Sequence, residues 1–264
     1  MAGPTDASDF SAPRVVFVTG GGRGIGRAIA LAFAAGGATV AIAARTLSQL
    51  EETASAIRAR GARAIVLTMD VTDSASVTQG FAELANHTKR IDVLVNNAGI
   101  GGGEPVQDSD ESAWRRIVDT NVVGTYLVTR AALPLMPDGG RIINMSSVLG
   151  RFGVRGYTAY CASKHAVIGF TRALALELAP RAITVNAICP GWVETDMAVE
   201  GMTLGAQALE TTYEDFRSRA LEAVPIERII QPEEVARLVS FLAAPESSAI
   251  TGQTYNICGG QIMN

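Results

Sequence analysis

Short runs of apolar, β-branched residues alternate along the whole chain with longer segments whose apolar residues recur at helical spacing. The run Val15–Val18 is followed by a helical pattern over Gly24–Ala35, and Ala38–Ala43 by one over Leu47–Arg60. Strands this apolar are typical of a parallel sheet buried on both faces, and right-handed crossovers make such a sheet doubly wound. The remaining expected strands are Ala64–Thr68, Ile91–Val95, Arg141–Met145, Ala182–Ile188 and Thr254–Ile257, and the remaining expected helices are Ser74–Asn86, Glu111–Leu133, Tyr157–Ala179 and Pro232–Leu242.

Length and composition predict one globular domain without a polyanionic partner. The 264 residues, 48% of them hydrophobic, suit a single α/β domain over residues 14–264, preceded by a flexible tail over residues 1–13. A net charge of −4 provides no basic groove for nucleic acid and no polybasic membrane anchor. No apolar run reaches the roughly 20 residues that span a bilayer.

The cysteines and the N-terminal sequence indicate a cytoplasmic protein without a metal site. Cys161, Cys189 and Cys258 are widely spaced and form no CxxC or Cys/His pattern. The first residues have neither the cationic region nor the apolar core of a signal peptide. We therefore expect buried free thiols in a reducing compartment.

One segment, residues 193–224, interrupts the alternation. It is long, contains Met and Leu, and shows no clear strand. It also follows a predicted strand at its carboxyl end, where ligands bind in open α/β sheets. We interpret it as a helical lid over the substrate, with an additional surface helix pair as the alternative.

A glycine-rich loop, TGGGRGIG, joins the first strand to the first helix. Gly20 allows a tight turn, while Gly24 and Gly26 allow backbone, ligand and helix to approach closely. The helix N-terminus then directs N–H donors and a positive dipole end at a pyrophosphate. The loop therefore predicts a dinucleotide site, contacted by Gly20, Gly22, Arg23, Gly24, Ile25 and Gly26.

The end of the second strand indicates which dinucleotide binds. A carboxylate about 20 residues beyond the glycines would hold the 2′-hydroxyl of NAD, but the sequence there is Ala43-Ala44-Arg45-Thr46. Arg45 can pair with a 2′-phosphate, and Arg23 of the glycine loop could reach the same group. We therefore predict NADP(H), with Arg45 and Thr46 among its contacts. A solvated surface arginine is the alternative for Arg45.

Tyr160 and Lys164, in the stretch YCASK, lie one helical turn apart, so both side chains leave the same face of a helix. An ammonium roughly 5 Å from a phenol favours the phenolate by about 3 kcal/mol, or about two pKa units, at an effective dielectric near 20. The pair is therefore predicted to lower the pKa of Tyr160 and to let it exchange a proton with an alcohol or ketone.

Together these motifs resemble the short-chain dehydrogenase/reductase family in its main branch of about 250 residues. TGxxxGIG, Asn96-Asn97-Ala98-Gly99, a serine ahead of YxxxK, and PGxxxT beginning at Pro190 occur in the family's order, and the resemblance covers Arg14 to Gly260. It implies a Rossmann-like fold with seven parallel strands in the order 3-2-1-4-5-6-7.

The resemblance also implies a catalytic role for four residues. Tyr160 would be the acid/base, Lys164 would lower its pKa and hold the ribose, and Asn121 would hold a water in a proton relay to Lys164. Ser147 would bind the substrate oxygen, with Ser146 as the alternative, since only one of the two should face the site. The further cofactor contacts that the resemblance implies are Asp70, Val71, Asn97, Ala98, Gly99, Pro190, Gly191, Val193 and Thr195, in addition to Tyr160 and Lys164.

The implied reaction is hydride transfer from NADPH to a ketone, reversible to the oxidation of a secondary alcohol. The lid and the C-terminal sequence resemble those of β-ketoacyl and polyketide reductases and of cyclic or aryl alcohol dehydrogenases. An apolar pocket is expected from Val154, Trp192, Met197, Met202 and Leu204, with Leu209 and Phe216 further along the lid, and Arg151, Arg155 and Arg217 could approach its mouth.

Two other functions remain open at this point: an NAD-dependent dehydrogenase of secondary alcohols or hydroxyacyl groups, and a non-catalytic NADP-binding sensor. By resemblance we also expect a homotetramer built on the two long helices and the last strand.

Overall fold

The computed structural model describes residues 14–103 and 105–263, and the predicted tail, residues 1–13, lies outside these ranges. Seven strands form one sheet in the order β3-β2-β1-β4-β5-β6-β7, and every neighbouring pair is parallel. This is the predicted order. The strands are β1 (Val15–Thr19), β2 (Thr39–Ala44), β3 (Ala64–Thr68), β4 (Val93–Asn96), β5 (Arg141–Met145), β6 (Thr184–Pro190) and β7 (Thr254–Ile257).

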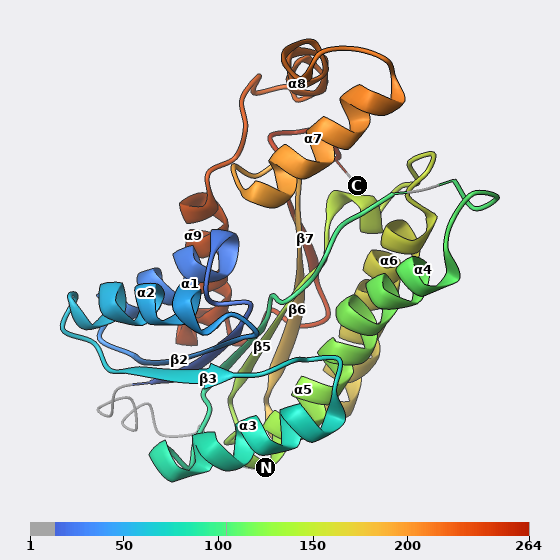
Figure 1. The fold of residues 1–264 in the computed structure, drawn as a ribbon. Helices are drawn as coiled ribbons and strands as arrows, with labels where there is room; N and C mark the ends of the chain where they lie inside the picture. The colour runs from blue at the N-terminus through green and yellow to red at the C-terminus, as the bar shows by residue number, and fades with distance from the viewer. Residues whose placement is uncertain (1–13, 104, 264) are drawn as a thin grey trace.

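Helices cover both faces of the sheet (Figure 1). One apolar cluster joins α1, α2 and α9 to one face, and a second joins α3, α5 and α6 to the other. The α-helices are α1 (Gly24–Ala35), α2 (Leu47–Arg58), α3 (Ser74–His87), α4 (Glu111–Val118), α5 (Gly124–Ala132), α6 (Thr158–Leu178), α7 (Asp196–Ala208), α8 (Tyr213–Glu222) and α9 (Pro232–Ala243). Short helical turns are η2 (Asp119–Val123), η3 (Leu133–Leu135), η4 (Val148–Gly150), η5 (Ala179–Arg181) and η6 (Pro245–Ser247).

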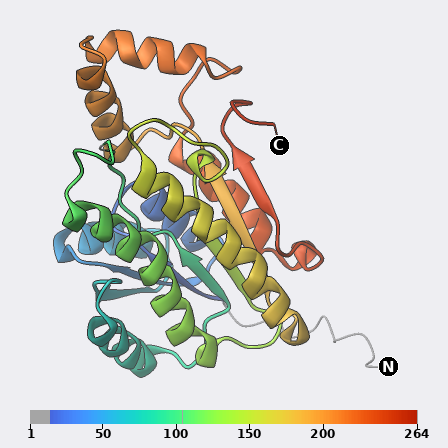
Figure 2. The ribbon, with the colours of Figure 1, turned by 90° about the vertical axis from the view of Figure 1, so that its right-hand side faces the viewer.

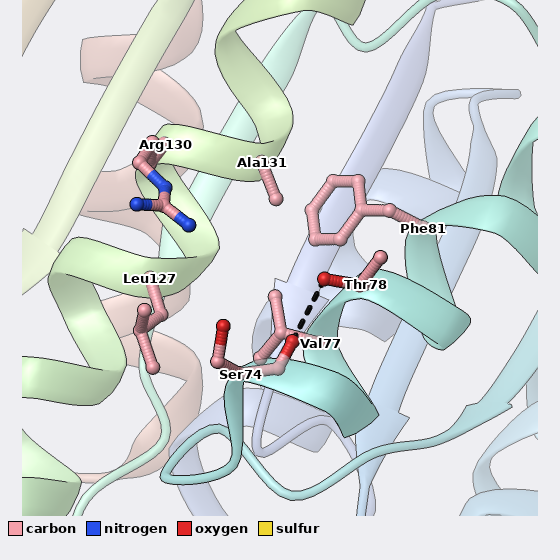
Figure 3. Close-up of a pocket in the computed structure, with 7 residues that line it drawn as sticks. All are labelled: Ser74, Val77, Thr78, Phe81, Leu127, Arg130 and Ala131. Carbon is pink, nitrogen blue, oxygen red and sulfur yellow. Dashed lines mark hydrogen bonds between the residues drawn. The ribbon is translucent and has the colours of Figure 1, made fainter.

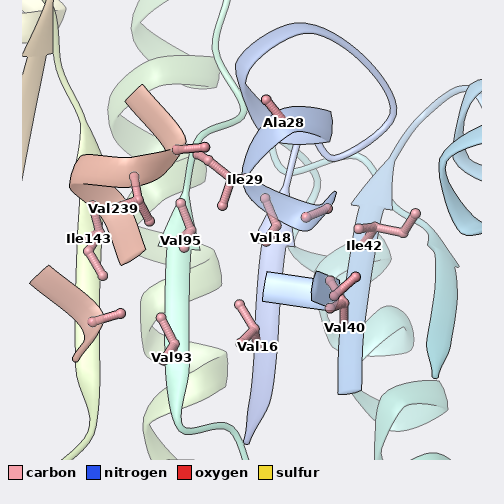
Figure 4. Packing of buried hydrophobic residues seen from close by; sticks show 14 of the residues in the cluster. Val16, Val18, Ala28, Ile29, Val40, Ile42, Val93, Val95, Ile143 and Val239 are labelled. Atoms are coloured by element: carbon pink, nitrogen blue, oxygen red, sulfur yellow. The ribbon is translucent and has the colours of Figure 1, made fainter. Parts of the chain in front are cut away.

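Alternation along the strands produces the two apolar layers. Val16 and Val18 of β1 point into the first cluster, where Ile29 of α1 and Val239 of α9 also lie (Figure 4). Phe17, between them in the sequence, points into the second cluster. Because both faces are buried, the strands need the nearly continuous apolar runs that the sequence has.

The predicted long helix Glu111–Leu133 is not one regular helix. It consists of α4, the π-helical turn η2 and α5, followed by the 3-10 turn η3. The wider turn is centred on Asn121, whose side chain bonds the backbone of Ile100 in both directions. Single π turns inside α-helices are frequent at functional sites.

The predicted lid is a pair of helices, α7 and α8, which lie together beyond the sheet at the top of Figure 1. Figure 2 shows the same pair at one end of the molecule, with α5 and α6 running alongside each other below it. An isolated parallel bridge joins Val193, at the start of the segment, to Ile230, which follows the segment. The end of the lid also touches the C-terminal segment, since the backbone N–H of Ile226 donates to the carbonyl of Gly259.

Candidate active site

Four loops meet at the carboxyl edge of the sheet, where ligands bind in doubly wound folds. They follow β1, β4, β5 and β6, and they contain the glycine loop, the Asn96–Gly99 motif, the two serines and the Pro190–Thr195 motif. The parallel pairing of β1 with β4, β4 with β5 and β5 with β6 brings these loops together although they are far apart in the sequence.

The glycine loop is built around backbone contacts that leave no room for side chains. Gly20 has a φ of +66°, and a Cβ on Gly26 would overlap the carbonyl oxygen of Gly20. The Asn97 amide donates to the carbonyls of Thr19 and Gly20 over 3.0 and 3.3 Å. In return, the Thr19 hydroxyl accepts from the backbone N–H groups of Asn97 and Ala98, both at 3.0 Å. The Asn96–Gly99 motif therefore fixes the shape of the loop.

The first turn of α1 suits a phosphate ligand. Its N-cap residue, Arg23, makes no side-chain capping bond, and the first turn has no acidic residue. Unpaired N–H groups and the positive end of the helix dipole therefore meet at a loop whose glycines carry no side chains. These features fit the dinucleotide that the sequence predicts.

At the adenosine end, Arg45 and Thr46 are exposed just after β2. Across residues 14–103 and 105–263, Arg45 has no hydrogen-bond or ion-pair partner, which leaves its guanidinium available to a 2′-phosphate. Asp70 accepts hydrogen bonds from the backbone and the hydroxyl of Thr72, and its neighbour Val71 packs beside Gly124.

The predicted catalytic residues gather around the carboxyl ends of β4 and β5. Lys164 is buried, its Nζ lies 5.5 Å from the centre of the Tyr160 ring, and it donates to the carbonyl of Met145 over 3.0 Å. A Cβ added to Gly99 would lie 3.0 Å from Asn121 Oδ1 and 3.4 Å from Lys164 Nζ. Gly99 therefore leaves the space in which the lysine and the asparagine face each other.

The predicted lowering of the pKa of Tyr160 is wrong for this arrangement. Burial raises the pKa of Tyr160 to about 12, and hydrogen bonding with Ser147 opposes the shift without cancelling it. Burial also lowers the pKa of Lys164 to about 8. Desolvation is the largest cause of both shifts, and both shifts favour the neutral forms. A phenol that stays protonated is suited to donate a proton.

The structure distinguishes the two candidate serines. Ser147 lies beside the Tyr160 phenol and accepts a bond from the backbone N–H of Leu149. Ser146 instead donates to the backbone carbonyl of Lys164 over 2.9 Å and is buried under α6. The prediction that Ser147 faces the site matches this geometry, and Ser146 anchors the helix that carries the lysine.

Asn121 is held by three hydrogen bonds. Its Oδ1 accepts from the N–H of Ile100 at 2.9 Å, and its Nδ2 donates to the Ile100 carbonyl and to Ser163 Oγ, both at 3.0 Å. Ser163 in turn donates to the backbone carbonyl of Tyr160 over 2.8 Å. Ser163 was not among the predicted residues, although its place three residues after Tyr160 puts it on a neighbouring face of the same helix.

The Pro190–Thr195 motif joins the sheet to the lid. The N–H of Gly191 donates to Ile257 of β7 over 3.0 Å, and Val193 is buried. Thr195 caps α7 through a bond from Ala198 N and packs against Gly24 of the glycine loop. The residues predicted to clamp the carboxamide therefore lie next to the predicted pyrophosphate site.

Four of the predicted pocket residues are at least partly exposed: Val154, Trp192, Met197 and Leu204. Met197 lies 3.6 Å from the position of a Cβ on Gly101, so it faces the glycine-rich wall that follows the Asn96–Gly99 motif. Trp192 packs near Gly201 of α7, and Val154 is half-buried. Leu204 is 45% exposed.

Met202 does not line an open pocket, contrary to its prediction, because it is completely buried. Arg151 does not point into the mouth of the site either. It bonds the carbonyl of Thr254 and the side chain of Asn256, so it ties the loop after β5 to β7. Arg217 lies 4.0 Å from Glu194, and Phe216 packs against Gly205 between the two lid helices.

A hollow of about 280 Å³ lies between α3 and α5, and none of the predicted site residues lines it. Figure 3 shows Arg130 of α5 at one side and Phe81 of α3 at the other. Over the described part of the chain there is no cluster of three or more potential metal ligands. That part also contains no helix of the length and hydropathy needed to cross a membrane.

Comparisons with known proteins agree with this geometry. A family model described as enoyl-(acyl carrier protein) reductase matches residues 20–261. A protein of Streptomyces virginiae, named as a ketoacyl reductase of the monensin polyketide synthase, is 44% identical over 95% of this chain and 97% of its own length. The 3-oxoacyl-[acyl-carrier-protein] reductase of Synechocystis is 40% identical over 95% and 97%. The crystal structure of a single-residue variant of actinorhodin polyketide ketoreductase with NADPH superposes with a TM-score of 0.90 at 39% identity, covering 94% of this chain and 97% of that one.

Proposed function

The chain belongs to the short-chain dehydrogenase/reductase family and is an NADP(H)-dependent oxidoreductase of C=O and CH–OH groups, and we propose that it reduces a β-ketoacyl-type or bulky cyclic or aryl ketone to a secondary alcohol. The observation that carries this proposal is the meeting of Tyr160, Ser147 and Lys164 beside the glycine loop. The relatives named as ketoacyl reductases support the substrate class.

Reduction needs a proton donor, a holder for the substrate oxygen and a nearby positive charge. The nicotinamide supplies the hydride when it is bound. Tyr160 stays protonated at neutral pH because its pKa is raised to about 12, so its phenol can donate to the forming alkoxide. Ser147 holds the oxygen near the phenol, and the Lys164 ammonium stabilises the phenolate that remains.

Cofactor preference follows from the end of β2. Arg45 is exposed without a partner among the described residues, and no acid stands beside it to repel a 2′-phosphate. An NAD-dependent dehydrogenase of secondary alcohols would need a carboxylate there to hold the 2′-hydroxyl.

The decisive experiment is oxidation of NADPH and of NADH in parallel with a β-ketoacyl thioester, a cyclic diketone and an aryl ketone. Consumption of NADPH in preference to NADH with at least one ketone is expected. Preference for NADH would favour the NAD-dependent dehydrogenase, and binding of NADPH without turnover of any ketone would favour the sensor.

We also propose that the chain forms a homotetramer. The outward face of α6 carries small exposed residues, Ala162, Ala166 and Gly169, and ends at Leu176, which is 80% exposed. Such a face permits close approach of a second helix. Light scattering coupled to size-exclusion chromatography measures the mass, and a monomer would contradict the proposal.

A further inference from the structure

An ion pair joins the glycine loop to the lid. Arg23 NH1 lies 2.7 Å from Asp196 Oδ2, although the two residues are 173 positions apart in the sequence. Arg23 is the N-cap residue of α1, and Asp196 is the acidic residue in the first turn of α7. Both side chains are mostly exposed, at 56% and 70%, so solvent and a ligand can reach the pair.

The glycine loop and the first turn of α7 are also in contact next to this ion pair. Thr195 caps α7, and its Cγ2 would lie 3.3 Å from a Cβ on Gly24. The first turn of the lid therefore rests directly on the loop that is expected to hold the pyrophosphate. Arg23 is at the same time a cation that the 2′-phosphate of the cofactor can attract and the partner of a lid carboxylate.

We propose that Asp196 sets the affinity for NADPH by competing with the 2′-phosphate for Arg23; this inference rests on the proposed use of NADP(H). A phosphate with up to two negative charges and three acceptor oxygens binds a guanidinium more strongly than one carboxylate does. If Arg23 bridged both anions, they would lie within a few ångströms of each other, where like charges repel. NADH has no 2′-phosphate and leaves the Arg23–Asp196 pair in place.

Competition of this kind links cofactor recognition to the lid. When the 2′-phosphate of NADPH binds Arg23, the Arg23–Asp196 ion pair between the glycine loop and the first turn of α7 must break. By linkage, anything that strengthens that contact weakens NADPH binding by the same factor. Asp196 is thus a specificity-determining residue, acting through Arg23 and not through a contact of its own with the cofactor.

The test measures dissociation constants of NADPH and NADH by cofactor fluorescence at low ionic strength, because salt screens exposed pairs. Asp196→Asn should lower the Kd of NADPH by about two- to fivefold, the range that exposed ion pairs permit. The Kd of NADH should not change. In a background that already contains Arg23→Ala, adding Asp196→Asn should have no effect on either cofactor.

Glu200→Gln is the matched control, since it removes one negative charge from an exposed position on the same helix. An equal gain in NADPH affinity in Glu200→Gln, or a gain that persists without Arg23, would mean that general repulsion operates, and would overturn the inference. A change shared by NADH, no change, or weaker NADPH binding in Asp196→Asn would also overturn it. If the wild-type protein did not bind NADPH, the proposed function would fail first; tight NADPH binding that Asp196→Asn leaves unaltered defeats this inference alone.

Discussion

The glycine loop and the lid lie against each other at one edge of the sheet, yet backbone contacts determine the shape of the loop and side chains line the lid. In the loop, a Cβ on Gly26 would overlap the backbone oxygen of Gly20, so backbone contacts determine the shape. In the lid, a Cβ on Gly201 would lie 3.5 Å from the Trp192 ring, which is an ordinary contact. The part expected to hold the cofactor is fixed by backbone, and the part expected to cover the substrate is lined by side chains that can change.

Burial follows the same division. The central strands and the predicted catalytic residues Asn121, Ser147 and Lys164 are buried, whereas α8 contains no buried residue. Helices with few buried contacts open at low free-energy cost, and binding lids are drawn from such segments. We therefore expect substitutions in the fixed part to affect turnover or folding, and substitutions on the surface of the lid, away from Asp196, to affect substrate binding alone.

The largest expected effect tests the catalytic end of the fixed part. Tyr160→Phe removes the proposed proton donor and should reduce kcat by about a thousandfold, within the range for general acid catalysis. The Kd of NADPH should change little. Tyr157→Phe, at the N-cap of the same helix and with its ring packed on Gly103, is the matched control and should retain most activity. If the two variants lost equal activity, Tyr160 would not be the specific donor.

A smaller effect, on stability, tests whether backbone really defines the loop. Gly26→Ala forces a methyl group into the Gly20 carbonyl and should cost about 3 kcal/mol, which lowers Tm by roughly 10 °C and weakens NADPH binding. Gly201→Ala, the lid counterpart, should leave Tm within about 2 °C. Thermal unfolding of both variants measures the difference, and equal Tm values would contradict the comparison.

The next smaller effect concerns the preference for NADPH over NADH. Arg45→Asp removes a charge-assisted bond and introduces repulsion, so the ratio of kcat/KM for NADPH over NADH should fall by about a hundredfold. Arg60→Asp makes the same charge change beyond the other end of α2 and should leave the ratio unaltered. An unchanged ratio in Arg45→Asp would place the 2′-phosphate elsewhere.

The pH dependence of ketone reduction should report Lys164. Its pKa, lowered to about 8 by burial, means that the ammonium is lost as the pH rises through 8, and kcat should fall up to tenfold for each further pH unit. Tyr160 cannot cause this fall, because its pKa of about 12 keeps it protonated. Rates between pH 6 and 10 at saturating NADPH measure it, with NADPH affinity followed at each pH as the control. A rate that stays level to pH 10 would show that the charge of Lys164 is not required.

Local patterns were sufficient to predict most of the fold. The strands Ala64–Thr68, Arg141–Met145 and Thr254–Ile257 and the helix Gly24–Ala35 have the predicted bounds. Apolar runs and caps are properties of neighbouring residues, so they can be recognised in the sequence. The prediction of one long helix was wrong at Asn121, where the chain forms a π turn. The Asn121 side chain there bonds the backbone of Ile100, which is distant along the chain, so neighbouring residues do not reveal the turn.

The motifs led to residues that lie together in the structure, but they did not predict how burial changes the chemistry of those residues. Spacing along the helix placed Tyr160 and Lys164 on one face, but it contains no measure of burial, which reverses the expected pKa shift of Tyr160. Met202 and Leu204 are both apolar residues of one helix, and only packing shows which of them is buried. The Arg23–Asp196 pair likewise depends on tertiary contact. The roles of the site residues, the tetramer and the cytoplasmic location stay predictions.

The smallest expected effect lies on the lid. Leu204 is 45% exposed, so Leu204→Ala should leave Tm nearly unchanged and raise the KM of a bulky ketone about two- to fivefold, because about 1 kcal/mol of apolar contact is lost. Met202→Ala, on the same helix but fully buried, should instead cost about 2–5 kcal/mol of stability. Steady-state kinetics with an aryl ketone and thermal unfolding separate the two results. A Leu204→Ala variant with an unaltered KM would remove Leu204 from the pocket, and one with weaker NADPH binding would mean that the lid also takes part in holding the cofactor.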